Sequence, residues 1–331
     1  MKFSPYIQQA FVSAVAILAT TGLAAQPTVV APRAPEGDIE ITVGSSAGAT
    51  PDMLMRRVAK LLNDEGLVEQ PVVVVNRTGG AWVIASNYVL RREGDENLLF
   101  SLVPTIFTTP IVQGLPNTYD RVTPLSYLMK IDLIVLGQPD ADTDTLAELV
   151  AVARQRDRGV AIAGANVGST DHMVTALIES AAGVKFNYVP FDGGGGVIAT
   201  FLGGNVDVIT LALDEAYPLL QSGKVKPLAI LSENRRAEPN LRDIPTAREQ
   251  GIDVVWGQDF GIVGPPGLDP AIIAWWDDVF ARMVETEAWA DMLAENFLRP
   301  QHTNSAETTV LMREMYQRYL AVLRDVGLAK Q

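Results

Sequence analysis

The feature of this 331-residue sequence that most constrains its fold is a glycine-containing segment that occurs twice. Residues 44–53 read GSSAGATPDM, and residues 164–173, which lie 120 positions later, read GANVGSTDHM, with Gly, Gly, Thr and Met at matching places. A second segment, residues 79–85 (GGAWVIA), recurs 114 positions later as residues 193–199 (GGGGVIA). Two segments repeated in the same order predict two α/β units of similar plan, each with two glycine-rich turns.

Short apolar runs alternate with amphipathic stretches around the first copy. Residues 39–43 (IEITV), 72–75 and 98–102 predict strands, while residues 51–63 place leucine and valine at helical spacing and a second helix is expected to run through Val89. This alternation predicts a mostly parallel sheet with helices on both faces. In such sheets ligands bind beyond the carboxyl ends of the strands, where the repeated turns lie.

Length and composition limit the classes of protein that remain. The chain exceeds the size at which one core usually stops growing, which favours two domains of middling size. With 39 acidic and 26 basic residues and a net charge of −13, it offers no basic stripe, so we expect no nucleic-acid partner. It has no Cys and only two His, His172 and His302, so we expect neither a metal site nor a cofactor.

The first 25 residues have the pattern of an export signal. Lys2 precedes an apolar stretch at residues 10–23, and the small residues at 22–25 offer a cleavage point after Ala24 or Ala25. The alternative is a membrane anchor, but the stretch is shorter than the roughly 20 residues that a span requires. We therefore expect residues 1–25 to be a cleaved signal peptide that exports the chain from the cytoplasm.

The repeated turns are candidate anion sites. Glycine lets the backbone approach a ligand closely, and a helix start presents free N–H groups at the positive end of the helix dipole. Thr50 is expected to cap the first helix, with Pro51 at its first position, and Ser169 or Thr170 is expected to cap the equivalent helix. The alternative interpretation is that these residues only cap helices.

Two patterns suggest a serine enzyme instead. Residues 44–48 match the G-x-S-x-G of a hydrolase nucleophile turn, with Ser46 as the nucleophile, but the predicted helix starts about four residues after it. Ser169 and His172 are close enough to meet, yet Asp171 would point elsewhere on the helix and not orient the imidazole. The Gly193–196 run lacks the Gly-Lys-Ser/Thr ending of a nucleotide-binding loop.

The motifs as a set resemble those of a known family, the TctC/Bug periplasmic solute-binding proteins of tripartite tricarboxylate transporters. The similarity spans about residues 39–299. Residues 47–52 (AGATPD) correspond to the family's Pro-Gly-Gly-x-x-Asp turn, and residues 76–79 (NRTG) to its Asn-Arg-Pro-Gly turn. Residues 168–173 (GSTDHM) correspond to Gly-Ser-x-x-His-Leu, and residues 189–193 (VPFDG) to Val-Pro-Tyr/Phe-x-Gly.

This resemblance implies an α/β type II periplasmic-binding fold, with two lobes and a ligand cleft between them. Lobe 1 would comprise residues 38–132 and 259–331, and lobe 2 residues 133–258. The resemblance also implies a set of ligand contacts on the loops that face the cleft. These are Ser46, Gly48, Ala49, Thr50, Asp52, Gly79, Gly80, Ser101, Val103, Gly168, Ser169, His172, Phe191, Asp192, Gly193 and Asp214.

Departures from the family pattern bear on the ligand. Ala47 and Ala49 replace Pro and the second Gly, and Asp192 and Asp259 stand where many members have a basic or an aromatic residue. Fewer cations near the cleft leave an anion to helix dipoles of about 0.3–1 kcal/mol each, which favours a mono- or dicarboxylate over a tricarboxylate. Trp82 replaces a usually small residue, and packing is the favoured interpretation over contact with an apolar ligand body.

Taken with the resemblance, the chain is expected to be a monomeric receptor that does no chemistry. It would capture a small-molecule carboxylate by a hinge motion near residues 130–136 and 254–261 and deliver it to the membrane permease subunits of the transporter. Two alternatives remain open. One is a secreted esterase that uses Ser46, and the other is a carboxylate sensor subunit for a membrane kinase.

Overall fold

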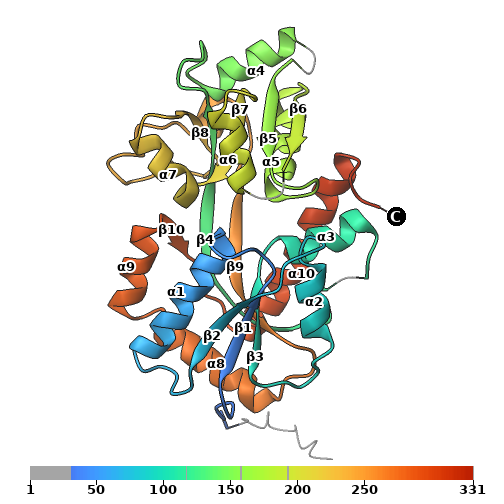
Figure 1. The fold of residues 1–331 in the computed structure, drawn as a ribbon, viewed down its shortest axis with the longest axis vertical. Helices are drawn as coiled ribbons and strands as arrows, with labels where there is room; N and C mark the ends of the chain where they lie inside the picture. Colours follow the sequence, from blue (N-terminus) through green and yellow to red (C-terminus); the bar gives the residue numbers. More distant parts are fainter. Residues whose placement is uncertain (1–30, 117, 157–158, 192–193, 331) are drawn as a thin grey trace, which may run out of the picture. The chain divides into compact units, whose positions relative to one another are not determined.

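The first half of the computed structural model shows the expected strand and helix alternation (Figure 1). The structure describes residues 31–116, 118–156, 159–191 and 194–330, so the expected signal peptide lies outside the described residues. Its first six elements are β1 (Ile39–Val43), α1 (Thr50–Asp64), β2 (Val72–Asn76), α2 (Val83–Leu90), β3 (Leu98–Leu102) and α3 (Thr105–Gln113). The bounds expected for β1 and β3 are confirmed, β2 is one residue longer at its end, and α1 is one residue longer at each end.

The second half repeats this plan. Its six elements are β5 (Ala161–Gly164), α5 (Thr170–Ala182), β6 (Asn187–Pro190), α6 (Gly194–Leu202), β7 (Val208–Ala212) and α7 (Leu213–Gln221). β1 pairs in parallel with β2 and β3, and β5 pairs in parallel with β6 and β7. The third helices correspond too, because α3 and α7 each have nine residues with a proline as the sixth, Pro110 and Pro218.

The sheet as a whole is mixed, so the expectation of a mostly parallel sheet was wrong. Two long strands, β4 (Thr123–Gly137) and β9 (Gly257–Gly264), run antiparallel to their neighbours. β4 pairs with β9 and β10 (Leu298–Pro300) through residues 123–132, and with β7 and β8 (Lys226–Ile230) through residues 133–137. β4 thus pairs with strands of both groups and carries the chain from one group to the other (Figure 1).

Burial follows from the strand order. β3 and β7 lie inside the sheet and are buried at every position, whereas β2 and β6 form its edges and stay partly exposed. The remaining described helices are α4 (Leu146–Gln155), the short 3-10 helix η1 (Arg248–Gln250), α8 (Pro270–Met283), α9 (Glu287–Glu295) and α10 (Ser305–Asp325). α10 packs against β4 and α3. Within the described ranges, no helix combines the length and apolarity needed to cross a bilayer.

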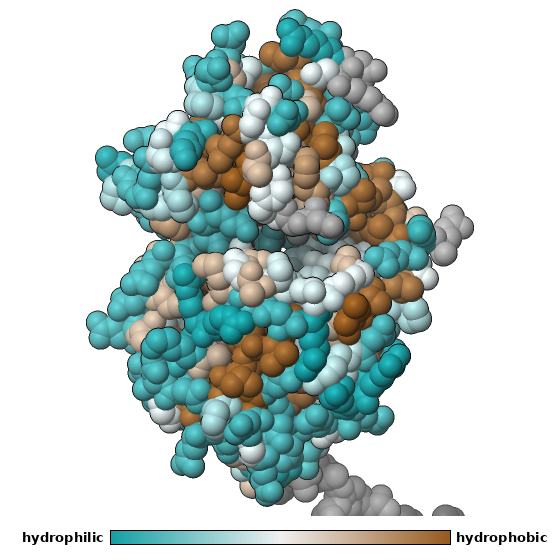
Figure 2. Space-filling view, in the orientation of Figure 1, coloured by the Kyte–Doolittle hydropathy of each residue, from teal (hydrophilic) through white to brown (hydrophobic). Residues whose placement is uncertain are grey.

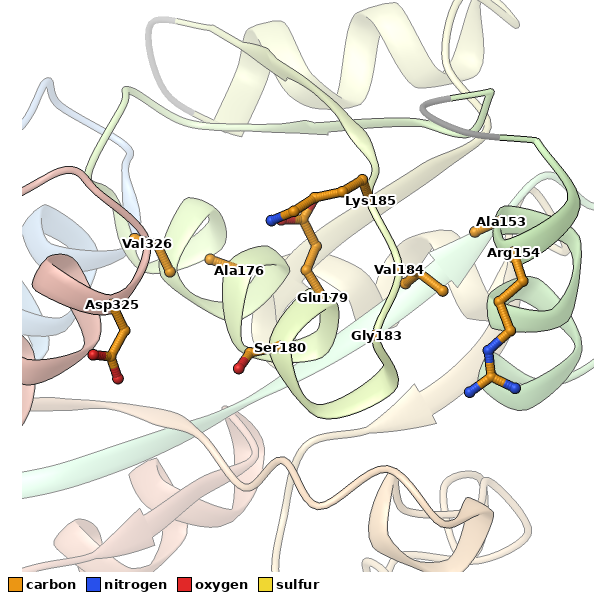
Figure 3. A pocket seen from close by; sticks show the side chains of 10 residues that line it. All are labelled: Ala153, Arg154, Ala176, Glu179, Ser180, Gly183, Val184, Lys185, Asp325 and Val326. Atoms are coloured by element: carbon orange, nitrogen blue, oxygen red, sulfur yellow. The ribbon is translucent and has the colours of Figure 1, made fainter.

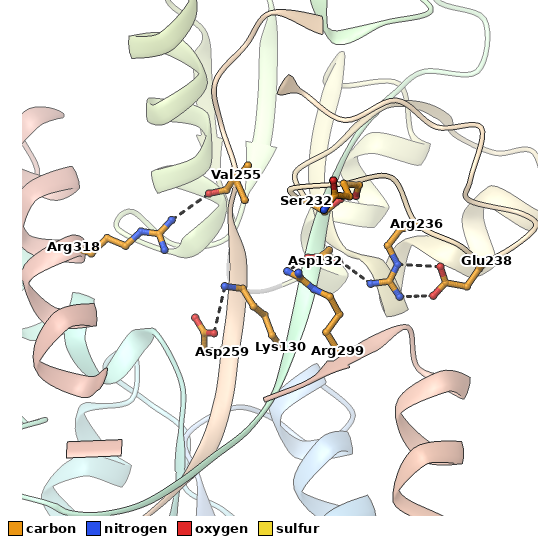
Figure 4. A network of polar contacts seen from close by, with 10 residues as sticks. Lys130, Asp132, Ser232, Arg236, Glu238, Val255, Asp259, Arg299 and Arg318 are labelled. Atoms are coloured by element: carbon orange, nitrogen blue, oxygen red, sulfur yellow. Dashed lines mark hydrogen bonds and ion pairs between the residues drawn. The ribbon is translucent and has the colours of Figure 1, made fainter. Parts of the chain in front are cut away.

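A buried ion-pair network holds β4 where it passes from one group to the other (Figure 4). Asp132 is fully buried and accepts hydrogen bonds from Arg236 Nη1 at 2.8 Å and Arg299 Nη2 at 2.5 Å. Arg236 follows β8, and Arg299 lies on β10. Two steps earlier on β4, Lys130 pairs with Asp259 of β9 at 3.5 Å. A buried carboxylate requires such partners. Here one arginine comes from each of the two strand groups that β4 joins.

Candidate ligand-binding site

A cavity of about 590 Å³ lies where the two strand groups meet, a size that fits a small-molecule site. Side chains and backbone from both halves line it, and residues of intermediate hydropathy gather along this seam in the space-filling view (Figure 2). Seven of the residues expected to contact ligand line the cavity. They are Ser46, Ala49, Thr50, Gly79, Gly80, Gly168 and Ser169.

The turn between β1 and α1 is held by a carboxylate beneath it. Gly48 has a φ of 84°, and its N–H donates to Asp52 Oδ2 at 2.8 Å. Asp52 also accepts from Asn76 Nδ2 at 2.8 Å and from the Arg56 guanidinium at 2.9 Å. Burial acts to raise the pKa of Asp52, but these hydrogen bonds outweigh it and hold the pKa below its usual value. Asp52 is thus a buried support of the turn and does not line the cavity.

The turn between β5 and α5 has the same backbone path with different supports. Gly168 has a φ of 83°, and its N–H donates to His172 Nδ1 at 3.2 Å. The imidazole stacks on Tyr188 with ring centroids 4.1 Å apart. Burial lowers the pKa of His172, which keeps Nδ1 free to accept. Like Asp52, His172 supports the turn and is not among the residues that line the cavity.

The helix caps differ from expectation in one half. Ser169 caps α5 by accepting from the His172 N–H at 3.3 Å, as predicted. Thr50 does not cap α1, because the helix begins at Thr50 and the cap position falls on Ala49, which has no side-chain acceptor. The Thr50 hydroxyl lies instead 3.1 Å from Glu215 Oε1 and 3.3 Å from Asp214 Oδ2, so it links the first half to α7 of the second.

The turn between β2 and α2 offers free donors to the cavity. Gly79, Gly80, Ala81 and Trp82 have φ values of 126°, 60°, 50° and 75°, so four successive residues are left-handed. The N–H groups of Gly79, Gly80 and Ala81 donate to no residue that the structure describes, and all three residues line the cavity. Consecutive backbone N–H groups in such a turn can form a concave donor site, so this run in the cavity wall suits an anion.

Trp82 packs inside the first half, which was the favoured interpretation. The residue is buried, its ring lies 5.9 Å from that of Phe100, and a Cβ on Gly44 would fall 2.4 Å from its indole. Trp82 therefore packs inside the first half and requires glycine at position 44. The residue also forms part of the cavity wall.

The other expected contacts lie elsewhere. Ser101 and Val103 are buried at the end of β3 without lining the cavity, and Phe191 is not among its lining residues. Gly48 and Asp214 line a neighbouring hollow of about 270 Å³. Asp192 and Gly193 lie outside the described residues.

One face of α3 is a part of the wall that the sequence analysis did not identify. Thr105, Thr108, Thr109 and Gln113 all line the cavity, and the Thr109 hydroxyl donates to the Ala81 carbonyl at 2.9 Å. Their spacing of three and four residues places them on one face of a helix. The matching prolines of α3 and α7 are the sequence signal of this third repeated turn, which also brings α7 and Glu215 to the cavity.

The charge in the cavity wall is entirely acidic. Among the described residues that line it there is no Lys, Arg or His, and the two charged members are Asp171 and Glu215. Burial raises the pKa of Asp171 to about 6. Burial, together with the nearby Asp214 and Asp171, raises the pKa of Glu215 to about 7. A ligand entering this site therefore meets carboxyl groups that no cation compensates.

The serine-enzyme patterns do not assemble a relay among the described residues. Ser46 is exposed, its hydroxyl has no described hydrogen-bond partner, and α1 begins four residues later. Ser169 Oγ lies 3.3 Å from the Tyr188 hydroxyl. Asp171 Oδ2 accepts from the Ala165 N–H at 2.8 Å and does not orient His172, as predicted.

A second hollow, of about 470 Å³, lies at the outer face of the second half (Figure 3). α4, α5 and the end of α10 form it, and three of its four charged side chains have described partners. Lys185 pairs with Glu179 at 2.6 Å, and Arg154 donates to the Ala182 carbonyl at 3.0 Å. It contains none of the expected contacts, so the cavity between the halves is the better candidate.

Comparisons with known proteins identify the family and confirm the resemblance. Residues 54–328 match the model of the tripartite tricarboxylate transporter family receptor, TctC. Protein BugT of Bordetella pertussis is 27% identical over 94% of this chain and 95% of its own. The R. palustris protein Rpa4515, solved with adipate, is 25% identical with a TM-score of 0.81 and covers 89% of this chain and 99% of its own.

A third relative shows the fold alone. MatC from Rhodopseudomonas palustris, solved with bound malate, is 21% identical with a TM-score of 0.74 and covers 87% of this chain and 99% of its own. Both neighbours share the fold of this chain, with its two strand groups joined by β4 and β9. The family match covers most of the sequence, and the chain therefore belongs to the TctC family of tripartite tricarboxylate transporter receptors.

Proposed function

We propose that this protein captures an organic carboxylate, a mono- or dicarboxylate, in the cavity between its halves and delivers it to a membrane permease. The observation that carries this proposal is the run of unpartnered N–H groups at Gly79, Gly80 and Ala81 in the cavity wall. Such donors can hold a carboxylate without a cationic side chain. That Rpa4515 was solved with adipate supports the same class of ligand.

The proposed lobes are those expected from the sequence, with residues 38–132 and 259–331 in one and residues 133–258 in the other. The change of partners along β4 at residues 132–133 supports this boundary. Capture would involve closure of the lobes about β4 and β9. Two contacts that join the halves would hold a closed form. The Thr50 hydroxyl lies 3.1 Å from Glu215 Oε1. Val112 of α3 lies so close to Gly168 that a Cβ added to this glycine would be 2.6 Å from the valine side chain.

The TctC family is periplasmic. The proposal includes export by the signal peptide at residues 1–25, a monomeric receptor and transfer of ligand to the permease subunits of a tripartite transporter. The ligand contacts proposed are the expected residues that line the cavity, together with the threonine face of α3.

The test is a thermal-shift and calorimetric screen of protein that has been unfolded and refolded to remove any co-purified ligand. The panel holds mono-, di- and tricarboxylates, aromatic acids, amino acids, sugars and esters. Ligand at a hundred times its dissociation constant adds about 2.7 kcal/mol to the unfolding free energy, which moves the midpoint by a few degrees. Stabilisation by carboxylates and not by sugars is expected, and its absence would contradict the proposal.

A matched pair of variants locates the site. Thr109→Val removes the hydroxyl that holds the Ala81 carbonyl, and we expect a loss of about 1 kcal/mol of binding free energy, or roughly fivefold in affinity. Thr309→Val on the exposed face of α10 removes a similar hydroxyl bond, to Ser305, and should leave affinity unchanged. Ester turnover that disappears in Ser46→Ala would instead support the esterase.

A further inference from the structure

Two carboxyl groups in the cavity wall have few partners. Glu215 is within reach of one donor, the Thr50 hydroxyl, and Asp171 accepts from one, the Ala165 N–H. An ionised carboxylate has about four acceptor positions, so each retains several that no described donor fills. No described lining residue is cationic. Glu215 is outside the machinery that holds the turns, which Asp52 and His172 provide, whereas Asp171 also bonds the β5–α5 turn at Ala165.

A buried hydroxyl in the same wall also lacks a partner. Thr210 on β7 is fully buried and lines the cavity, and its Oγ1 makes no hydrogen bond with any described residue. Buried polar atoms are almost always bonded, so an unpartnered one in a cavity wall indicates that a ligand or water completes it. This observation is independent of the carboxylates and points to a polar occupant.

The unpartnered N–H groups and Glu215 lie on different sides of the cavity. The unpartnered N–H groups of Gly79 to Ala81 are tied to α3 through Thr109, whereas Glu215 lies on α7. α3 and α7 lie on opposite sides of the β4 and β9 pair (Figure 1). A ligand that fits both would carry a negative group at one end and hydrogen-bond donors at the other.

We propose, on the basis of the proposed function, that the preferred ligand is a carboxylate that also carries an ammonium group, with Glu215 as the residue that selects for it. Asp171 assists from α5. An ammonium group brings three donors and a compensating charge to carboxylates that have neither. A second carboxylate at that place would meet like charge at reduced dielectric, which is unfavourable.

The first experiment compares matched pairs that differ only in the amino group. Refolded protein is titrated calorimetrically at pH 8 with succinate and aspartate, glutarate and glutamate, adipate and 2-aminoadipate, and butyrate and 4-aminobutyrate. At this pH Asp171 and Glu215 are ionised, because their pKa values are about 6 and 7. In the pair that binds best, the amino member should bind at least tenfold more tightly.

Variants test whether Glu215 causes the preference for the amino member of each pair. Glu215→Gln should reduce the preference to under threefold without weakening the amino-free member, and Asp171→Asn should reduce it less. Glu233→Gln, an exposed carboxylate after β8, is the control and should keep the full preference. Unfolding midpoints of the variants check that they fold.

The pH dependence of this preference can be measured on the protein without any substitution. The preference should decline as pH falls from 8 to 5, since protonation removes the charge on Glu215. The groups facing Glu215 are Asp214 on α7 and Asp171 on α5, and Arg57 of α1 acts on Asp214. Equal or weaker binding of every amino member, or an unchanged preference in Glu215→Gln, would overturn the inference while the proposed function stands. Failure of every carboxylate to bind would overturn both.

Discussion

The first turn of each half follows the same backbone path with different side chains supporting it. Gly48 and Gly168 have φ values of 84° and 83°, and the N–H of each is bonded by the side chain four residues later. In the first half that side chain is the carboxylate of Asp52, held by Arg56 and Asn76. In the second it is the neutral imidazole of His172, stacked on Tyr188.

This difference teaches which part of the repeat is constrained. The left-handed glycine and an acceptor four residues later define the turn, while the chemical nature of the acceptor is free. That freedom explains why the two ten-residue copies share only Gly, Gly, Thr and Met although their backbones agree. A charged support needs a network of donors around it, whereas a neutral ring needs only a stacking partner.

The largest expected effect comes from removing the supports. Asp52→Ala leaves Asn76, Arg56 and the Gly48 N–H without their common acceptor, and should lower the unfolding free energy by about 3 kcal/mol. His172→Ala loses one acceptor and one ring stack, and should cost about 2 kcal/mol. Urea unfolding at unchanged slope measures both.

The control for these variants is an exposed carboxylate on the same helix. Asp64→Ala breaks only the surface ion pair with Lys60 and should cost less than about 0.5 kcal/mol. An effect of His172→Ala equal to that of Asp52→Ala would show that the charged network adds nothing to the first turn.

The glycines test whether the turns differ in their surroundings. Gly48→Ala and Gly168→Ala each force a side chain into the left-handed region, at about 1 kcal/mol. At Gly48 a Cβ meets nothing within 4 Å, whereas at Gly168 it would lie 2.6 Å from Val112 Cγ2. We therefore expect about 2 kcal/mol for Gly168→Ala, measured by urea unfolding. If the contact with Val112 causes the extra loss, the double variant Gly168→Ala/Val112→Ala should lose less unfolding free energy than the sum of the losses of the two single variants.

The helix caps provide a smaller, reciprocal test. Ser169→Ala removes the cap of α5 and should destabilise by about 1 kcal/mol. Ala49 has the same extended backbone as Ser169, with φ −74° and ψ 157° against −66° and 169°, but no capping oxygen. Ala49→Ser should therefore stabilise by about 0.5 kcal/mol. A loss in Ala49→Ser would mean that the two turns are less alike than their dihedral angles indicate.

The smallest expected effect is local and depends on pH. The pKa of folded His172 lies below its usual value of 6.5, so the unfolded chain binds the proton first and the stability of this turn is lost as pH falls below about 6.5. The pKa of folded Asp52 also lies below its usual 3.8, so its turn weakens only below that pH. Hydrogen-exchange protection of the Gly168 amide should fall between pH 6.5 and 4.5 while that of Gly48 stays constant. Parallel loss at both amides would contradict this assignment.

The contribution of Asp171 and Glu215 to stability is expected to change in the opposite direction in the ligand-free protein. The pKa values of Asp171 and Glu215 are raised to about 6 and 7, so the folded state binds more protons and loses stability as pH rises from about 4 to 7. Amide exchange at the turns separates the contribution of His172 from this trend.

Much of the site was predictable because its turns are local in sequence. The repeat placed Ser46, Thr50, Gly79 and Gly168 on loops at the ends of strands, and the structure brings them to one cavity. Asp52 and His172 belong to the same turns, yet they point into the protein. The side of the turn that a residue takes is decided by its neighbours, here Asn76 and Tyr188, which come from the adjacent strands.

The sequence by itself determined the alternation of strands and helices, the two similar halves and the positions of the glycine turns, since these depend on periodicity and backbone freedom over a few residues. Only the tertiary structure decided the antiparallel crossing of β4 and β9, the network at Asp132 and the approach of Glu215 to Thr50. Each of these joins residues more than 100 positions apart in the sequence. Their contact depends on strand register and on how the two halves meet, which no local pattern encodes.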